Sequence, residues 1–195
     1  DVGVVFLNGP CGDVTQVDNR NPRPAEFGEA WSRRVGMTVG AEALKVLART
    51  EFSDTVPLAV TAEQLDLPIR DLAESDEALV AREVPATGLG SGGQEVYLRE
   101  ARLLREIKTA HPTVPVEVQA MRVGPAVLAA NSTEYFCALG LSIKKASPVQ
   151  PAMVVELANG YDGYSPTQEA LQGGGYEVRT ARSSFLEPGS GEKIA

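Results

Sequence analysis

The spacing of apolar residues predicts that the chain alternates between helices and strands. Apolar side chains recur every three or four residues over 25–49 and 94–110, which is the spacing of helices with one apolar face. A shorter helix is expected over about 134–146. Short apolar or alternating runs predict strands over 2–7, 56–60, 67–70, 114–122, 126–130 and 153–157. This order of elements predicts an α/β fold in which a mixed sheet has flanking helices.

Two long stretches between these elements predict loops. The stretch over 8–24 is rich in Gly, Pro, Asn and Asp, and loops of this length in a compact domain are usually functional or disordered. The glycine-rich stretch over about 85–93 predicts a flexible loop before the second long helix. The chain begins at Asp1, inside a predicted strand and without methionine, so we expect it to be part of a longer protein.

Composition and charge exclude several classes of protein. In 195 residues, 43% are hydrophobic and 23% charged, which is enough apolar material for a substantial core. The net charge of −8 argues against nucleic-acid binding, which needs a basic surface. The sequence contains no run of about 18 apolar residues, so it predicts no transmembrane segment. The single histidine excludes a site built from several histidines of this chain.

Four short motifs or single residues are best explained by a structural role. Gly88–Gly93 matches the G-x-G-x-x-G dinucleotide pattern, but the residues before it do not predict the strand that such a site requires, so a surface loop is favoured. His111 follows a helix, where a histidine commonly caps the last carbonyls. Cys11 has no basic neighbour in the sequence, so a packed small residue is favoured over a nucleophile. Ser132 or Thr133 is expected to cap the helix that follows.

Two polar loops are better candidates for a functional site. Residues 8–15 follow the first predicted strand, and residues 159–167 follow the strand predicted over 153–157. Sites in open α/β sheets form at the carboxyl ends of strands, where both loops fall. Glycines also serve in turns and tyrosines at rims, so a structural role for both loops stays open.

In these loops, and in the order of the segments between them, the chain resembles the neutral (non-lysosomal) ceramidase family. The resemblance is most specific in the Asn-x-Tyr-x-x-Tyr segment at 159–164. The other matching segments are 6–9, 12–15, Gly124-Pro125 with Glu134 ten residues on, and Gly175-Tyr176-Glu177. The resemblance implies that 1–195 is a single domain, or the C-terminal part of a larger neutral-ceramidase-like catalytic domain.

The resemblance also implies a site and a reaction. Glu134 and Tyr164 correspond to zinc ligands, and Tyr176 corresponds to a tyrosine that holds the substrate amide oxygen. Thr15 stands where the family has a catalytic serine. The implied reaction is the zinc-dependent hydrolysis of an N-acylsphingosine-type lipid amide to a fatty acid and a sphingoid base.

The implied site is incomplete within this chain. The family's two histidine ligands would have to come from a missing N-terminal part of the same protein or from a second chain. The resemblance further implies an extracytoplasmic or secreted protein. The alternative, from another class, is a non-catalytic ceramidase-like module that binds a ligand or partner.

Overall fold

The computed structural model describes residues 3–18, 20–21, 26–72 and 93–195. The chain divides into two compact units, one made of 1–14 with 58–195 and the other of 15–57. The glycine-rich loop expected over about 85–93 and the dinucleotide-like motif lie outside the described residues, apart from Gly93, which begins a helix.

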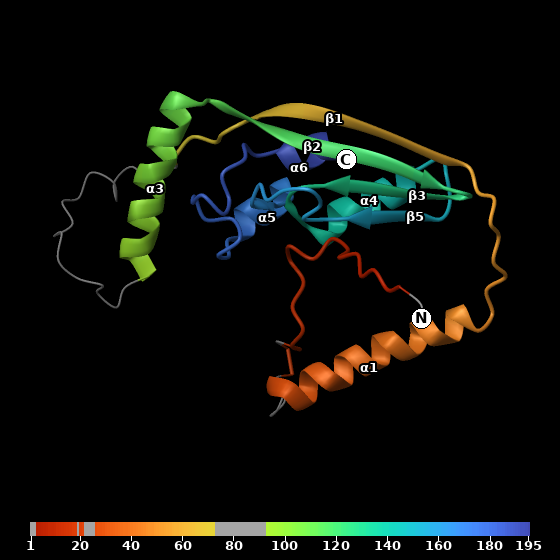
Figure 1. Ribbon diagram of the computed structural model, residues 1–195. Helices are drawn as coiled ribbons and strands as arrows, with labels where there is room; N and C mark the ends of the chain where they lie inside the picture. The colour runs from red at the N-terminus through yellow and green to blue at the C-terminus, as the bar shows by residue number, and fades with distance from the viewer. Residues whose placement is uncertain (1–2, 19, 22–25, 73–92) are drawn as a thin grey trace. The chain divides into compact units, whose positions relative to one another are not determined.

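The larger unit is built on a four-stranded mixed sheet in the order β1-β2-β3-β5 (Figure 1). The strands are β1 (Leu58–Pro68), β2 (Thr113–Val123), β3 (Ala126–Asn131) and β5 (Ala152–Val155). The first three pair antiparallel, and β3 pairs parallel with β5. The prediction of a mixed sheet with flanking helices is therefore confirmed.

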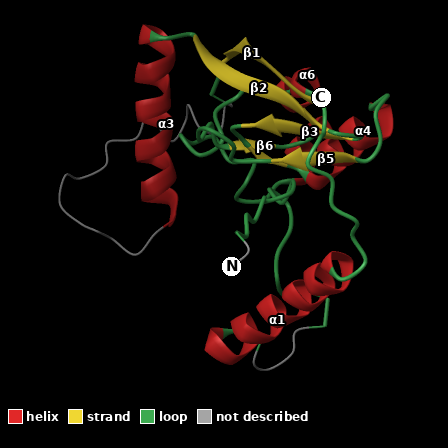
Figure 2. Cartoon of the chain, turned by 45° about the vertical axis from the view of Figure 1, so that its right-hand side comes forward, coloured by secondary structure: helices red, strands yellow, loops and turns green. Residues whose placement is uncertain are grey.

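A second, small sheet pairs two strands of two residues each. These are β4 (Glu134–Tyr135) and β6 (Tyr164–Ser165), which run parallel. The helices of this unit are α3 (Gly93–Ala110), α4 (Cys137–Ala146), α5 (Gln168–Gly173) and α6 (Ser190–Ile194). Figure 2 shows α4 and α6 close to the strands, with α4 contacting β5 and α6 contacting β1.

The core of the unit holds the small sheet in place. Tyr135 and Phe136 are buried against Leu139 of α4 and Val154 of β5. The Tyr135 hydroxyl donates a hydrogen bond of 2.6 Å to the carbonyl of Gly191, which attaches α6 to β4. Tyr135 is fully buried, so the residue next to it in sequence, Glu134, is carried by a rigid piece of backbone.

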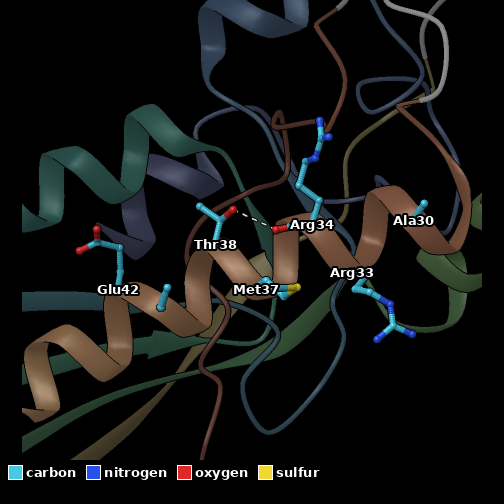
Figure 3. A pocket seen from close by; sticks show the side chains of 7 residues that line it. Ala30, Arg33, Arg34, Met37, Thr38 and Glu42 are labelled. Carbon is cyan, nitrogen blue, oxygen red and sulfur yellow. Dashed lines mark hydrogen bonds between the residues drawn. The ribbon is translucent and has the colours of Figure 1, made fainter.

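The smaller unit contains one long helix, α1 (Gly28–Leu47), as the apolar spacing predicts. A shallow hollow lies along this helix, and the described residues that line it belong to α1 (Figure 3). The Thr38 hydroxyl there donates to the carbonyl of Arg34 at 2.9 Å. Among the described residues, no helix is both long and apolar enough to cross a membrane.

The prediction of a buried first strand is wrong. Residues 3–7 form no regular secondary structure, and Val4, Val5 and Phe6 are 90%, 82% and 76% exposed. The sheet ends at β5, and no described strand pairs with this segment, so most of its apolar side chains remain exposed. An apolar run predicts a strand only where a partner strand is available.

Two further boundaries differ from the predictions. The helix expected from about Glu134 begins at Cys137, because the Glu134 amide donates to the carbonyl of Gly163 and the backbone continues as β4. Neither Ser132 nor Thr133 caps this helix; the carboxylate of Asp13 accepts from the Cys137 amide at 2.7 Å. The strand pieces expected over 56–60 and 67–70 merge into β1, an edge strand whose last residue is Pro68.

Candidate functional site

The small sheet brings Glu134 and Tyr164 side by side, because they are register partners on β4 and β6. The Glu134 amide donates to the carbonyl of Gly163 at 2.8 Å. Gly163 has φ of +69°, and a Cβ atom there would lie 2.7 Å from the Ser183 carbonyl oxygen, so only glycine fits. The backbone at Gly163 therefore fixes the position of Tyr164 relative to Glu134.

The first polar loop approaches the same strand closely. A Cβ atom on Gly12 would lie 2.5 Å from the Glu134 carbonyl oxygen, and the Gly12 amide donates to the Tyr135 carbonyl at 3.0 Å. The two loops that the sequence singles out, 8–15 and 159–167, thus both reach β4, the second through the Gly163 carbonyl. For the first loop, this statement concerns residues 8–14, because Val14 is the last residue of this segment that belongs to the larger unit.

The carboxylate of Glu134 is half-buried and faces tyrosine hydroxyls. The Tyr161 hydroxyl donates to its Oε1 at 2.9 Å. Burial first, and then this hydrogen bond to Glu134, raise the pKa of Tyr161 to about 12. Tyr161 is therefore a neutral donor over the physiological pH range.

Tyr164 and Tyr176 form a second pair at this place. Their hydroxyl oxygens lie 3.2 Å apart, and the rings meet edge to face with centroids 5.8 Å apart. The pKa of Tyr164 is raised well above its ordinary range by burial, by the hydrogen bond with Tyr176 and by the nearby Glu134 carboxylate. Without a metal ion, Tyr164 is thus a neutral phenol beside a carboxylate.

The loop that carries Tyr176 is attached to α3 by two arginines. Arg182 pairs with both carboxylate oxygens of Glu100, through Nη2 at 2.8 Å and Nε at 2.9 Å. Arg179 lies over the ring of Tyr97 at 4.7 Å from its centroid. These contacts attach the loop to α3 at Arg179 and Arg182. The Tyr176 side chain itself remains 59% exposed.

A buried carboxylate, Glu156, is bonded to the backbone of β4 and was not predicted from the sequence as a residue of interest. Glu156 is 3% exposed, and its Oε2 accepts from the amides of Cys11 and Tyr135, each at 2.9 Å. Its Oε1 accepts from the Cys11 thiol at 2.7 Å and from the Asn8 side-chain amide at 3.1 Å. The signal was present, since an acidic residue in the apolar run over 153–157 needs buried donors.

Cys11 is a packed residue of this network. Burial first, and then its hydrogen bond to Glu156, raise the pKa of the Cys11 thiol above its ordinary value. A raised pKa keeps the sulfur protonated and a poor nucleophile. The preference for a packed small residue at this position agrees with these contacts.

Thr15 and His111 are the other two residues considered from the sequence. Thr15 belongs to the other unit of the chain, where it is exposed and its hydroxyl donates to the Gln16 side chain at 3.5 Å. Its catalytic role stays a prediction. His111 follows α3 and is exposed, with its amide donating to the Ile107 carbonyl.

The donors around Glu134 suit a zinc ion in chemical type but not in number. A carboxylate oxygen is an ordinary zinc ligand, and the phenol of Tyr164 is a second oxygen beside it. A catalytic zinc ordinarily takes three protein ligands, and the described residues contain no group of three or more His, Cys, Asp and Glu placed to hold a metal ion. The described residues therefore bring together two oxygen donors of a type that zinc accepts, which is fewer than the ligands that a catalytic zinc ordinarily takes.

No family model matches this sequence, and no curated protein matches it. Two solved structures are similar in fold. One is the neutral ceramidase from Pseudomonas aeruginosa, with a TM-score of 0.55 and 18% identity, covering 90% of this chain and 33% of that chain. The other is a ceramidase complexed with C2, with a TM-score of 0.53 and 16% identity, covering 87% of this chain and 34% of that chain.

At these identities the likeness concerns the fold. The chain spans about one third of the length of the two structures, so it corresponds to a part of each of them. The resemblance that the polar loops suggest is thereby confirmed at the level of structure: this chain has the fold of a part of neutral ceramidase.

Proposed function

We propose that this chain supplies part of the active site of a zinc-dependent hydrolase of the ceramidase type. The observation that carries the proposal is the pairing of Glu134 with Tyr164 on β4 and β6, with the Tyr176 hydroxyl 3.2 Å from that of Tyr164. These are the residues that the family resemblance assigns to zinc and to the substrate oxygen. They come from three separate segments of the chain, and the fold brings them together.

In this proposal Glu134 and Tyr164 bind the zinc ion together with histidines from another segment of the protein or from a second chain. When bound, zinc lowers the pKa of water and polarises a carbonyl group. Tyr164 stays neutral at physiological pH when no metal is present, so it can be a hydrogen-bond donor beside the carboxylate. Thr15 is a weaker candidate for a further catalytic hydroxyl.

Tyr176 acts on the substrate in this account. Its hydroxyl donates a hydrogen bond to the amide oxygen, on which negative charge develops as water adds to the carbonyl carbon. The carbon–nitrogen bond then breaks, the nitrogen takes up a proton, and a fatty acid and a sphingoid base leave. The substrate class, an N-acylsphingosine-type lipid amide, and an extracytoplasmic or secreted location follow from the ceramidase likeness.

The test is hydrolysis of an N-acylsphingosine by the full-length protein and its variants. Tyr176→Phe should lower kcat by about 10²–10³-fold, the usual loss for one donor to a developing oxyanion. Tyr97→Phe is the matched control, because it removes a hydroxyl from α3 but keeps the ring under Arg179. Equal rates for wild type and Tyr176→Phe would overturn the role of Tyr176. No hydrolysis by the wild type would favour the non-catalytic ligand-binding module.

A further inference from the structure

The Glu134 main chain is held from several sides. Its amide is bonded to Gly163, and Gly12 approaches its carbonyl so closely that no side chain fits between them. The next amide, that of Tyr135, donates to the buried carboxylate of Glu156 at 2.9 Å. With the backbone fixed in this way, the torsions of the Glu134 side chain are what remains to be set.

The Tyr161 hydroxyl makes a hydrogen bond that restricts those torsions. The hydroxyl reaches Oε1 of Glu134 at 2.9 Å from the loop between β5 and β6. A carboxylate has two oxygens, so a hydrogen bond at Oε1 leaves Oε2 for another partner. Part of that loop is itself held, because the Asp162 amide donates to the Ser132 carbonyl at 2.9 Å and the Ser132 hydroxyl bonds to the Asp162 carboxylate.

This hydrogen bond contributes little to the stability of the fold. Tyr161 is 58% exposed and Glu134 is half-buried, so their hydrogen bond largely replaces bonds that both groups would make with water. Its larger effect is on orientation, since it reduces the number of rotamers that the Glu134 side chain can adopt.

We propose that Tyr161 is a positioning residue that orients the Glu134 carboxylate for metal binding, an inference that rests on the proposed function. Hydrogen bonds to a ligating group, made by residues that do not touch the metal, commonly change metal affinity by about 10–100-fold. Tyr161 fits this role because it contacts Glu134 directly, whereas Tyr164 is the proposed ligand and Tyr176 the proposed substrate donor.

The test is the zinc affinity of the full-length protein, measured by competition with a fluorescent zinc chelator. Tyr161→Phe should weaken zinc binding by about 10-fold or more, while the melting temperature of the metal-free protein changes little. Tyr97→Phe, which also removes one tyrosine hydroxyl, should bind zinc as the wild type does.

The possible results separate this inference from the proposal on which it rests. Zinc binding by wild type with equal affinity in Tyr161→Phe would overturn the positioning role and leave the proposed function in place. A Tyr161→Phe variant that loses zinc affinity only in proportion to a lost fold, seen as a large fall in melting temperature, would also overturn it. A wild-type protein that binds no zinc would overturn both.

Discussion

Glu134 and Glu156 are two carboxylates near the same strand, and their surroundings are opposite. Glu156 is 3% exposed and accepts four hydrogen bonds, from two amides, a thiol and a side-chain amide. Glu134 is half-buried, its carboxylate accepts a hydrogen bond from the Tyr161 hydroxyl, and the Tyr164 hydroxyl lies close enough to interact with it.

The contrast is the one expected between a structural carboxylate and a carboxylate that binds a ligand. A buried carboxylate whose oxygens are saturated with donors has no acceptor left for a metal or substrate, and it serves to join the segments that supply the donors. A carboxylate that is only partly surrounded by donors keeps an oxygen for another partner. Glu156 joins the loop over 8–14 to β4, whereas our proposal assigns Glu134, on that same strand, to metal binding.

The largest expected difference between the two residues is in how much each stabilises the fold. Replacing each glutamate by glutamine tests this difference. Glu156→Gln should lower the free energy of unfolding by about 2–3 kcal/mol, because its side-chain N–H groups would face donors in a buried site. Glu134→Gln should lower it by less than about 1 kcal/mol, since one partly exposed hydrogen bond is altered. Urea unfolding of both variants beside wild type measures the two values.

The opposite order of the two stability losses would contradict the comparison. A Glu156→Gln variant as stable as wild type would mean that the Cys11 and Tyr135 amides do not depend on the carboxylate. A strongly destabilised Glu134→Gln variant would give Glu134 the structural role that we assign to Glu156.

A smaller effect is expected at Glu100, a carboxylate paired with a cation near the surface. The hydrogen bonds from Arg182 hold the pKa of Glu100 below its ordinary value. A carboxyl whose pKa is lower in the folded than in the unfolded state stabilises the fold at neutral pH, and this contribution is lost as pH falls through the folded-state pKa. Glu100→Gln should therefore cost about 0.5 kcal/mol at neutral pH and nothing in strong acid.

The measurement is the difference in unfolding free energy between wild type and Glu100→Gln as a function of pH. A difference that grows as the pH falls would have the wrong sign for a carboxyl with a lowered pKa. Since Arg182 lies in the loop that carries Tyr176, Glu100→Gln should also weaken the attachment of that loop to α3.

The elements with long periodic patterns could be predicted from the sequence. The apolar stripe over 94–110 forms α3, and the alternating runs over 114–122 and 126–130 form β2 and β3. The segment 2–7 could not be predicted, because its apolar character says nothing about which strand would pair with it. Likewise, Glu134 lies on a strand rather than in a helix because of a bond to Gly163, 29 positions away.

The candidate site was predictable through its tyrosines and not through its supporting residues. The Asn-x-Tyr-x-x-Tyr spacing at 159–164 points to Tyr161 and Tyr164, but only the fold shows that one hydroxyl reaches Glu134 and the other Tyr176. Glu156 was missed because an acidic residue in an apolar run signals a need for buried donors but does not show which residues supply them. The Asp13 contact to α4 likewise depends on two segments that are 124 positions apart.

The central claim, that Glu134 belongs to a zinc site, is tested most directly by the zinc content of the full-length protein. The protein and its Glu134→Ala variant would be dialysed against metal-free buffer and analysed for zinc per mole. The account predicts about one zinc in the wild type and a large loss in a Glu134→Ala variant that remains folded. Zinc retained in full by Glu134→Ala, or absent from the wild type after zinc is supplied, would contradict it.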